Sequence, residues 1–181
     1  HGSVQPGRTH AVPAGARSDI ENMIGGVWDL DQAVRTAEAY IAQPGGPEWS
    51  DTLVIVTSDH SNSYMRLPFP LGKGDLPAQV LAGSSYTYPD GDVTYRTGNH
   101  TNELVTLWAR GQGAGLFQAA AGQWYSATHV VDNSQIYQGM LDAVQTQGVH
   151  HVILFIGDGM NVEHEIAGSR YLYGEDGALA W

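Results

Sequence analysis

Two short segments of the chain end in side chains that can bind a metal ion. In residues 52–60 a β-branched apolar run leads to Asp59 and His60, and in residues 151–160 a similar run leads to Asp158 between two glycines. The carboxyl ends of parallel strands meet at one edge of a sheet, where open α/β folds bind ligands, so we expect these three side chains to converge there. Carboxylate oxygens and an imidazole nitrogen together suit zinc. The alternative is two ordinary strands that end in polar turns.

The elements needed to position these residues can be predicted from periodicity. A capping-box pattern at Ser18–Glu21 precedes apolar residues at helical spacing up to Ile41, and Asp132 is a helix N-cap whose helix would bury Ile136, Met140, Leu141 and Val144. A further helix is expected over 163–172, with strands over 52–57, 104–109 and from 151 onward. Helices that alternate with apolar strands indicate an α/β fold, with a mainly parallel, doubly wound sheet and helices on both faces.

The chain is predicted to form one domain over residues 18–181, preceded by an irregular arm at 1–17. Between 62 and 98 periodicity is lost, which indicates a long excursion from the sheet, with a hairpin turn at 89–92. Tyr64, Arg66 and several tyrosines there either line a pocket or pack the excursion onto the sheet. The glycine-rich stretch 110–115 is predicted to be a loop rather than a phosphate-binding turn.

Composition limits the classes of function. A formal net charge of −11 with only eight lysines and arginines leaves no basic surface for nucleic acid or for an anionic membrane. No apolar run is long enough to span a bilayer, and no signal peptide is apparent in the first thirty residues. The chain has no cysteine, which excludes disulfides and thiolate zinc sites.

Three strings in the chain resemble the metal-binding motifs of the alkaline phosphatase family: Ile-Gly-Asp-Gly-Met at 156–160, Thr-Ser-Asp-His at 57–60, and Gly-Asn-His-Thr-Asn-Glu-Leu-Val at 98–105. The resemblance covers most of residues 18–181. The motif order is permuted, because the Gly-Asp-Gly-Met strand comes first in that family and last here. The resemblance implies an alkaline-phosphatase-like fold and metal-dependent hydrolysis of phosphate monoesters, with inorganic phosphate as a further ligand. It also implies zinc, optionally with magnesium, and a periplasmic or secreted location.

Matched to the family motifs, Asp158, Asp59 and His60 correspond to the ligands of the zinc that activates the nucleophile, and Asp158 also extends toward a magnesium site. His100 corresponds to a ligand of the second zinc. Its two companion positions fall on Val12 and Ala16, which cannot bind metal, so the second zinc site is expected to be incomplete unless His1, His10 or Asp19 substitutes.

The catalytic residue is unassigned. The family's nucleophilic serine and its phosphate-binding arginine belong to a segment that this sequence does not include, so we expect the chain alone to be far less active than a complete family member. Substitutes would be Ser58, Ser61, Ser63 and Ser169, although serines beside a metal usually hydrogen-bond to its ligands. The other functions left open are a non-catalytic, metal-binding permuted scaffold and one half of a split enzyme, whose partner would be a complementary fragment or a second copy. His129, His150 and His151 are expected to have structural or surface roles. For His164, which lies between Glu163 and Glu165, a role beside the metal ligands or in binding an adventitious metal is left open.

Overall fold

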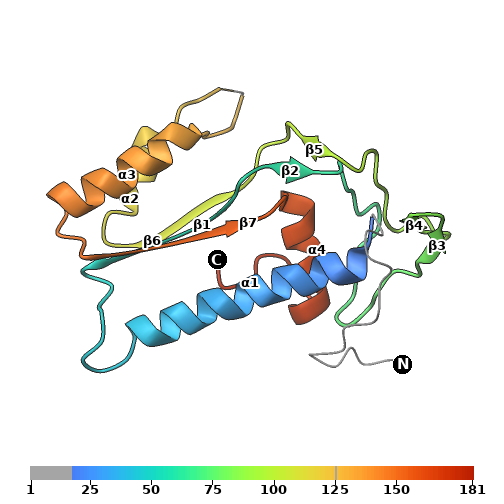
Figure 1. Ribbon diagram of the computed structural model, residues 1–181, viewed down its shortest axis with the longest axis horizontal. Helices are drawn as coiled ribbons and strands as arrows, with labels where there is room; N and C mark the ends of the chain where they lie inside the picture. The colour runs from blue at the N-terminus through green and yellow to red at the C-terminus, as the bar shows by residue number, and fades with distance from the viewer. Residues whose placement is uncertain (1–17, 125) are drawn as a thin grey trace. The chain divides into compact units, whose positions relative to one another are not determined.

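The computed structural model describes residues 18–124 and 126–181 (Figure 1). These residues form two compact units. The first comprises the chain up to Asp31, Asp59–Val105 and Asp158–Ala180, and the second comprises Gln32–Ser58, Thr106–Gly157 and Trp181. The arm at 1–17, with His1, His10, Val12 and Ala16, lies outside the described residues. The single domain over 18–181 stays a prediction.

The second unit contains a three-stranded sheet in the order β6 (Leu107–Gly111), β1 (Thr52–Ser58), β7 (His151–Gly157). β1 pairs parallel with β7 and antiparallel with β6, so the sheet is mixed rather than mainly parallel. The expected strand over 104–109 begins three residues later. The antiparallel pairing follows from the connection, because the chain leaves β1 at its carboxyl end and returns to the same end to begin β6.

The two apolar strands of the site have different environments. All seven residues of the central strand β1 are buried. β7 has no second strand neighbour among the described residues, and Val152, Leu154 and Ile156 are 37%, 37% and 56% exposed. A continuous apolar run is typical of a strand buried on both faces, and that interpretation of residues 151–157 was therefore wrong. An apolar, β-branched run favours a strand, but it does not say whether a neighbour covers it.

Helices flank both faces of this sheet (Figure 1). On one face, Leu53 and Ile55 of β1 pack against α2 (Gly115–Ala120) and α3 (Asn133–Thr146), and the second half of α1 (Ile20–Ile41) lies on the other. A capping box between Asp132 and Gln135 confirms the predicted start of α3. Of the expected stripe, Ile136, Met140 and Leu141 are half-buried and Val144 is half exposed, while the fully buried residues are Gly139 and Ala143. The short α2 was not predicted: it begins at Gly115, and β6 ends at Gly111, so only residues 112–114 of the glycine-rich stretch form the expected loop.

The first unit contains the beginning of α1, α4 (Val162–Tyr173) and the excursion. Two short antiparallel pairs occur here: β2 (Ser61–Asn62) with β5 (His100–Thr101), which lie at the two ends of the excursion, and β3 (Val80–Ala82) with β4 (Ser85–Thr87), which lie within it. The hairpin turn thus lies at 83–84, whereas the expected turn at 89–92 joins no strand pair. Asp19 rather than Ser18 caps α1, because Ser18 has a φ of 59° while the Asp19 carboxylate accepts the Asn22 N–H at 3.1 Å.

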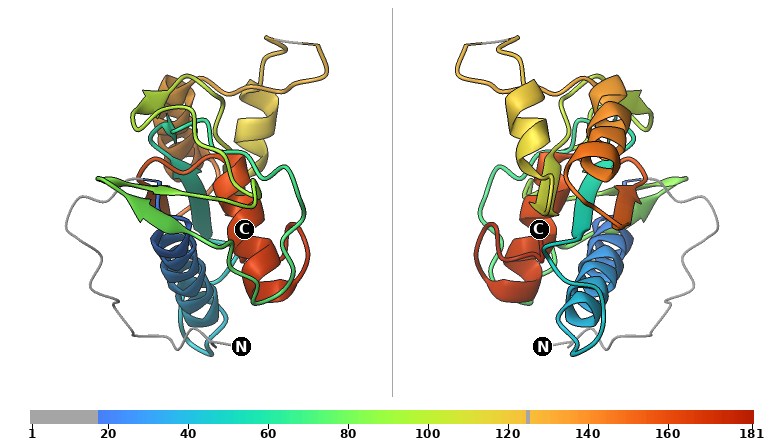
Figure 2. Two further views of the ribbon diagram at one scale, coloured as in Figure 1. Left: turned by 90° about the vertical axis from the view of Figure 1, so that its right-hand side faces the viewer. Right: turned by 90° about the vertical axis from the view of Figure 1, so that its left-hand side faces the viewer.

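The excursion forms a core with the two helices, which lie side by side (Figure 2). This core consists of Ile20, Ile24, Met65, Leu71, Val93 and Ala167. Tyr88 and Tyr95 pack against it, and the Tyr88 hydroxyl accepts the Ile20 N–H at 3.0 Å. Buried Asp31 accepts the Tyr173 hydroxyl at 2.5 Å and the Ala180 N–H at 2.7 Å, which joins α1 to the segment after α4. None of the described helices has the length and apolarity needed to span a membrane.

The contact between α1 and α4 yields a test of the fold. A Cβ on Gly168 would overlap the Cγ1 of Val27, whereas a Cβ on Gly26 of α1 meets nothing within 4 Å. We expect Gly168→Ala to lower the free energy of unfolding by about 1–3 kcal/mol. Gly26→Ala should raise it by roughly 0.5–1 kcal/mol, because alanine loses less backbone entropy in a helix. Urea denaturation of both variants measures this, and a stabilised Gly168→Ala would contradict the packing.

Candidate metal centre

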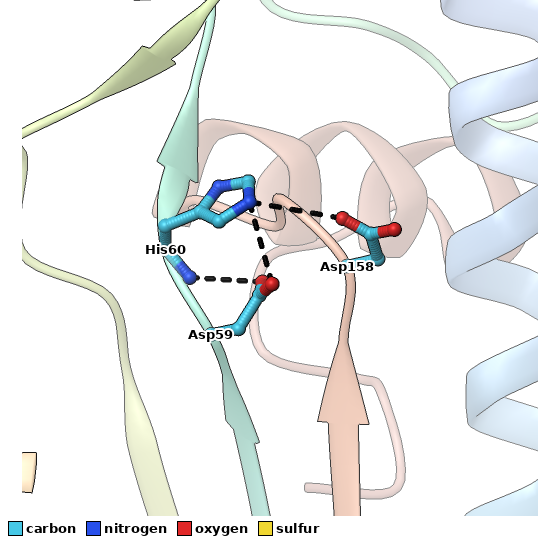
Figure 3. Close-up of side chains that lie close together, drawn as sticks. All are labelled: Asp59, His60 and Asp158. Atoms are coloured by element: carbon cyan, nitrogen blue, oxygen red, sulfur yellow. Dashed lines mark hydrogen bonds and ion pairs between the residues drawn. The ribbon is translucent and has the colours of Figure 1, made fainter.

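The pairing of β1 with β7 brings two aspartates together. The last partners in the parallel register are Ser58 and Gly157, so the next residues, Asp59 and Asp158, leave the sheet at the same end. Each of Asp59, His60 and Asp158 offers a ligand atom, and the three atoms lie within 4.8 Å of one another (Figure 3). The expected convergence is confirmed, and the group could hold one metal ion. The Asp158 side chain is 96% exposed, as expected for a residue at the end of a sheet.

The orientation of the His60 ring defines its available nitrogen. Its Nδ1 lies 3.0 Å from the carbonyl oxygen of Ser61, which can only accept, so Nδ1 carries a hydrogen. Its Nε2 lies 3.3 Å from Asp59 Oδ2 and 3.8 Å from Asp158 Oδ1. A lone pair facing two carboxylates is unfavourable unless a cation separates them, either a proton on Nε2 or a metal ion. A histidine that donates its other N–H to a carbonyl is the usual arrangement of a metal ligand.

Asp59 is held in place by backbone donors. Its Oδ1 accepts the N–H of Gly159 at 3.0 Å and that of His60 at 2.9 Å, which leaves Oδ2 facing the imidazole. The hydrogen bond from Gly159, with a smaller contribution from nearby His60, holds the pKa of Asp59 below its ordinary value. The carboxylate is therefore ionised near neutral pH, which is the form that binds a metal.

Gly159 is needed for this arrangement for two reasons. Its φ is +69°, which side chains rarely adopt, and an added Cβ would lie only 3.2 Å from His60 Cε1 and from Asn62 Nδ2. The second glycine of the Gly-Asp-Gly motif thus lets the backbone approach His60 closely and directs its own N–H at Asp59.

His164 supports the loop that carries Asp158, through hydrogen bonds that were not predicted from the sequence. Asn161 is the N-cap of α4, with His164 as its reciprocal partner: the Asn161 N–H lies 3.3 Å from His164 Nδ1, and the ring also hydrogen-bonds to the backbone of Gly159. Asn161 Nδ2 donates to the Asn62 carbonyl oxygen at 3.1 Å, which ties this loop to the segment after His60. The signal available in the sequence was an asparagine three residues before a polar side chain.

His100 lies beside the centre but outside its ligand group. Its ring stacks on that of His60 with centroids 3.5 Å apart and planes inclined by 21°, and β5 brings it there through the pairing of His100 with Asn62. No other cluster of three metal-binding side chains occurs among residues 18–124 and 126–181. Asp19, one of the expected substitutes for the second zinc site, instead caps α1. His100 as a zinc ligand stays a prediction.

The four candidate nucleophiles are buried and hydrogen-bonded. The Ser58 hydroxyl donates to the Gly157 carbonyl at 2.7 Å, and that of Ser169 donates to the Glu175 carbonyl at 2.6 Å. Ser61 donates to Glu103 at 3.2 Å, and Ser63 to the Asn62 carbonyl at 2.8 Å. All four are less than 10% exposed. These serines serve local structure, and the catalytic residue stays unassigned.

No protein-family model, curated protein or solved structure significantly matches this chain.

The buried His164 predicts a specific dependence of stability on pH. Burial lowers the pKa of His164 to about 4, from 6.5 for an ordinary histidine, so the unfolded chain binds more protons between these pH values. The stability contributed by neutral His164 is complete above pH 6.5 and is lost as the pH falls toward about 4, by roughly 3 kcal/mol in total. We expect the unfolding free energy of His164→Gln to vary less across this window than that of the wild type. Urea denaturation measures this, with exposed His129→Gln as the control. Equal pH dependence of the two variants would contradict the assignment.

Proposed function

We propose that Asp59, His60 and Asp158 bind a zinc ion and that the chain is the metal-binding part of a phosphate-monoester hydrolase similar to alkaline phosphatases. The observation that supports this most directly is the position of His60 Nε2, within 3.3 Å and 3.8 Å of two carboxylate oxygens on separate segments. Three such ligands leave a fourth tetrahedral position for a substrate oxygen, as catalytic zinc sites require. The second oxygen of exposed Asp158 offers the hard ligand that magnesium prefers.

Each residue near the centre would have a separate role in such a site. His60 presents Nε2, with its ring fixed by the Ser61 carbonyl and by the stacked His100, while Asp59 stays ionised through the Gly159 N–H. Asp158 faces solvent, so an ester can approach from its side. When bound, zinc supplies Lewis-acid polarisation of a phosphoryl oxygen. Phosphate monoesters and inorganic phosphate are accordingly the proposed ligands, and by family resemblance the site would work in a periplasmic or secreted setting.

Because the four serines are buried, we expect this chain alone to hydrolyse phosphate esters slowly. Two alternative functions therefore remain open. One is a metal-binding scaffold without catalysis, and the other is one half of a split enzyme whose partner supplies the nucleophile. The complementary fragment or second copy would have an edge to pair with, because one side of β7 has no strand neighbour among the described residues.

The metal site is tested by titrating zinc into chelator-treated protein and measuring binding by calorimetry. Asp158→Asn should weaken zinc binding by about a hundredfold or more, since it removes a charged ligand directly. The exposed side chain makes few contacts, so the variant should fold as the wild type does. Asp90→Asn, which removes an exposed carboxylate elsewhere in the same unit, is the matched control. Equal zinc affinity of the two variants would refute the site.

Hydrolysis is tested separately. With zinc and an aryl phosphate we expect turnover well below about 1 per second, the low end of ordinary enzymes. Inorganic phosphate should nevertheless bind to the zinc-loaded wild type more tightly than to the chelator-treated wild type, because the open metal position accepts a phosphate oxygen. Zinc binding without any zinc-dependent gain in phosphate affinity would instead support the non-catalytic scaffold. Chelator-sensitive turnover above this rate would mean that a nucleophile exists within the chain, and Ser58→Ala and Ser61→Ala would then identify it.

A further inference from the structure

A cavity of about 300 Å³ in the first unit is lined by Tyr64, Arg66 and Arg96. Two of the eight cationic residues of a chain with a net charge of −11 thus line one cavity. Its volume is at the lower end of the range of small-molecule sites, which is more than a bare inorganic anion fills.

The backbone that forms this cavity is irregular in a specific way. The segments 61–66 and 94–101 run antiparallel, with Asn62 opposite His100 and Arg66 opposite Thr94. Between these pairs the Ser63 carbonyl accepts both the Arg96 N–H at 3.0 Å and the Thr97 N–H at 3.3 Å. Two residues therefore oppose one, as in a β-bulge, which redirects side chains from the regular alternation.

Ser63 and Tyr64 adopt positive φ values of 64° and 47° in the same bulge. Neither residue is a glycine, and such conformations each cost on the order of 1 kcal/mol or more. Strained backbone of this kind is concentrated at ligand-binding positions, where it places particular side chains. Here it places the Tyr64 ring on the wall of the cavity, with its hydroxyl donating to Asn102 Oδ1 at 2.5 Å.

The charges of the two arginines differ in how far they are neutralised. Arg66 pairs with the Glu103 carboxylate and donates to the Met65 carbonyl at 2.6 Å. Arg96 is exposed, and no carboxylate among residues 18–124 and 126–181 forms an ion pair with it. The residues 1–17 include no aspartate or glutamate that could do so. Glu103 and, at longer range, Glu163 balance the charge of Arg66, so the positive charge that remains available at the cavity is that of Arg96.

We propose that this cavity is a binding site for a small organic oxyanion, with the guanidinium of Arg96 pairing with the anionic group and the Tyr64 ring contacting the apolar part of the ligand. A planar guanidinium binds two oxygens of a phosphate, sulfate or carboxylate in parallel hydrogen bonds. Arg66, held in position by Glu103, forms the neighbouring wall of the cavity. The site needs neither a bound metal nor hydrolytic activity, so it stands independently of the proposed function.

The test uses the full chain with chelator present, so that metal-bound phosphate does not contribute. Phenylphosphonate, benzenesulfonate and benzoate are titrated by calorimetry, with inorganic phosphate as the probe without an apolar part. At least one phenyl probe should bind, and more tightly than inorganic phosphate. Arg96→Gln should weaken binding by about tenfold or more, the effect of removing a charge-assisted bidentate contact. Arg110→Gln is the matched control, because Arg110 pairs with Glu38 in the other unit.

A second variant separates the two parts of the site. Tyr64→Ala should weaken binding of the phenyl probes by several-fold or more, as loss of an aromatic contact does, while leaving the affinity for inorganic phosphate unchanged. Far-ultraviolet circular dichroism and the thermal midpoint establish that each variant is folded. Equal affinity of Arg96→Gln and Arg110→Gln for every probe would overturn the proposal. Absence of binding by all four probes to the wild type at about ten millimolar, weaker than the millimolar range of marginal ligands, would overturn it as well.

Discussion

The parallel register of β1 and β7 is the constraint on which the metal centre depends. The strands pair from Thr52 with His151 to Ser58 with Gly157, and the chain continues from these last partners into Asp59 and Asp158. A slip of one residue would turn every side chain of one strand to the other face and move its aspartate by about 3.3 Å along the strand. The burial of all seven β1 residues opposes such a slip, because Leu53 and Ile55 would leave the contact with α2 and α3. The packing of β1 against α2 and α3 thereby fixes the register that brings Asp59 and Asp158 together.

Once the two carboxylates are neighbours, electrostatics determines the rest of the centre. Oxygen atoms of Asp59 and Asp158 near His60 Nε2 concentrate negative charge at one point, and the cost of this is reduced in two ways. The Gly159 N–H stabilises the Asp59 carboxylate directly, and the exposure of Asp158 lets water solvate it. His164 acts indirectly, because it holds the turn through hydrogen bonds with Asn161 and the backbone of Gly159. It carries no charge itself near neutral pH. A bound cation would neutralise the negative charge of the two carboxylates, which these contacts only partly stabilise.

The sequence predicts this centre better than it predicts the surrounding fold. The apolar runs before Asp59 and Asp158 identify both strands and their common direction, because β-branched residues favour extended backbone. They do not reveal that β7 has a single strand neighbour in the described part of the chain or that β6 runs antiparallel, since both depend on how the strands pair. The core of the first unit was also unpredictable, because Met65, Leu71 and Val93 follow neither helical nor strand periodicity and become apolar neighbours only through the course of the excursion. The hydrogen bonds of His164 could not be predicted, because capping depends on the local backbone and a polar residue near a glycine-rich turn has many other uses.

The overall charge of the chain gives the metal centre and the arginine cavity a shared physical role. A protein of net charge −11 repels phosphate and carboxylate ligands at long range, so an anion can bind only where positive charge is concentrated locally. The cavity of Tyr64, Arg66 and Arg96 provides such a place through guanidinium groups, and the Asp59, His60 and Asp158 group can provide it only after a cation binds. Anion binding at the two sites therefore depends on different conditions. Anion binding at the cavity should persist in the presence of chelator and weaken with salt, whereas anion binding at the acidic group requires the metal, because its own side chains would otherwise exclude any negatively charged ligand.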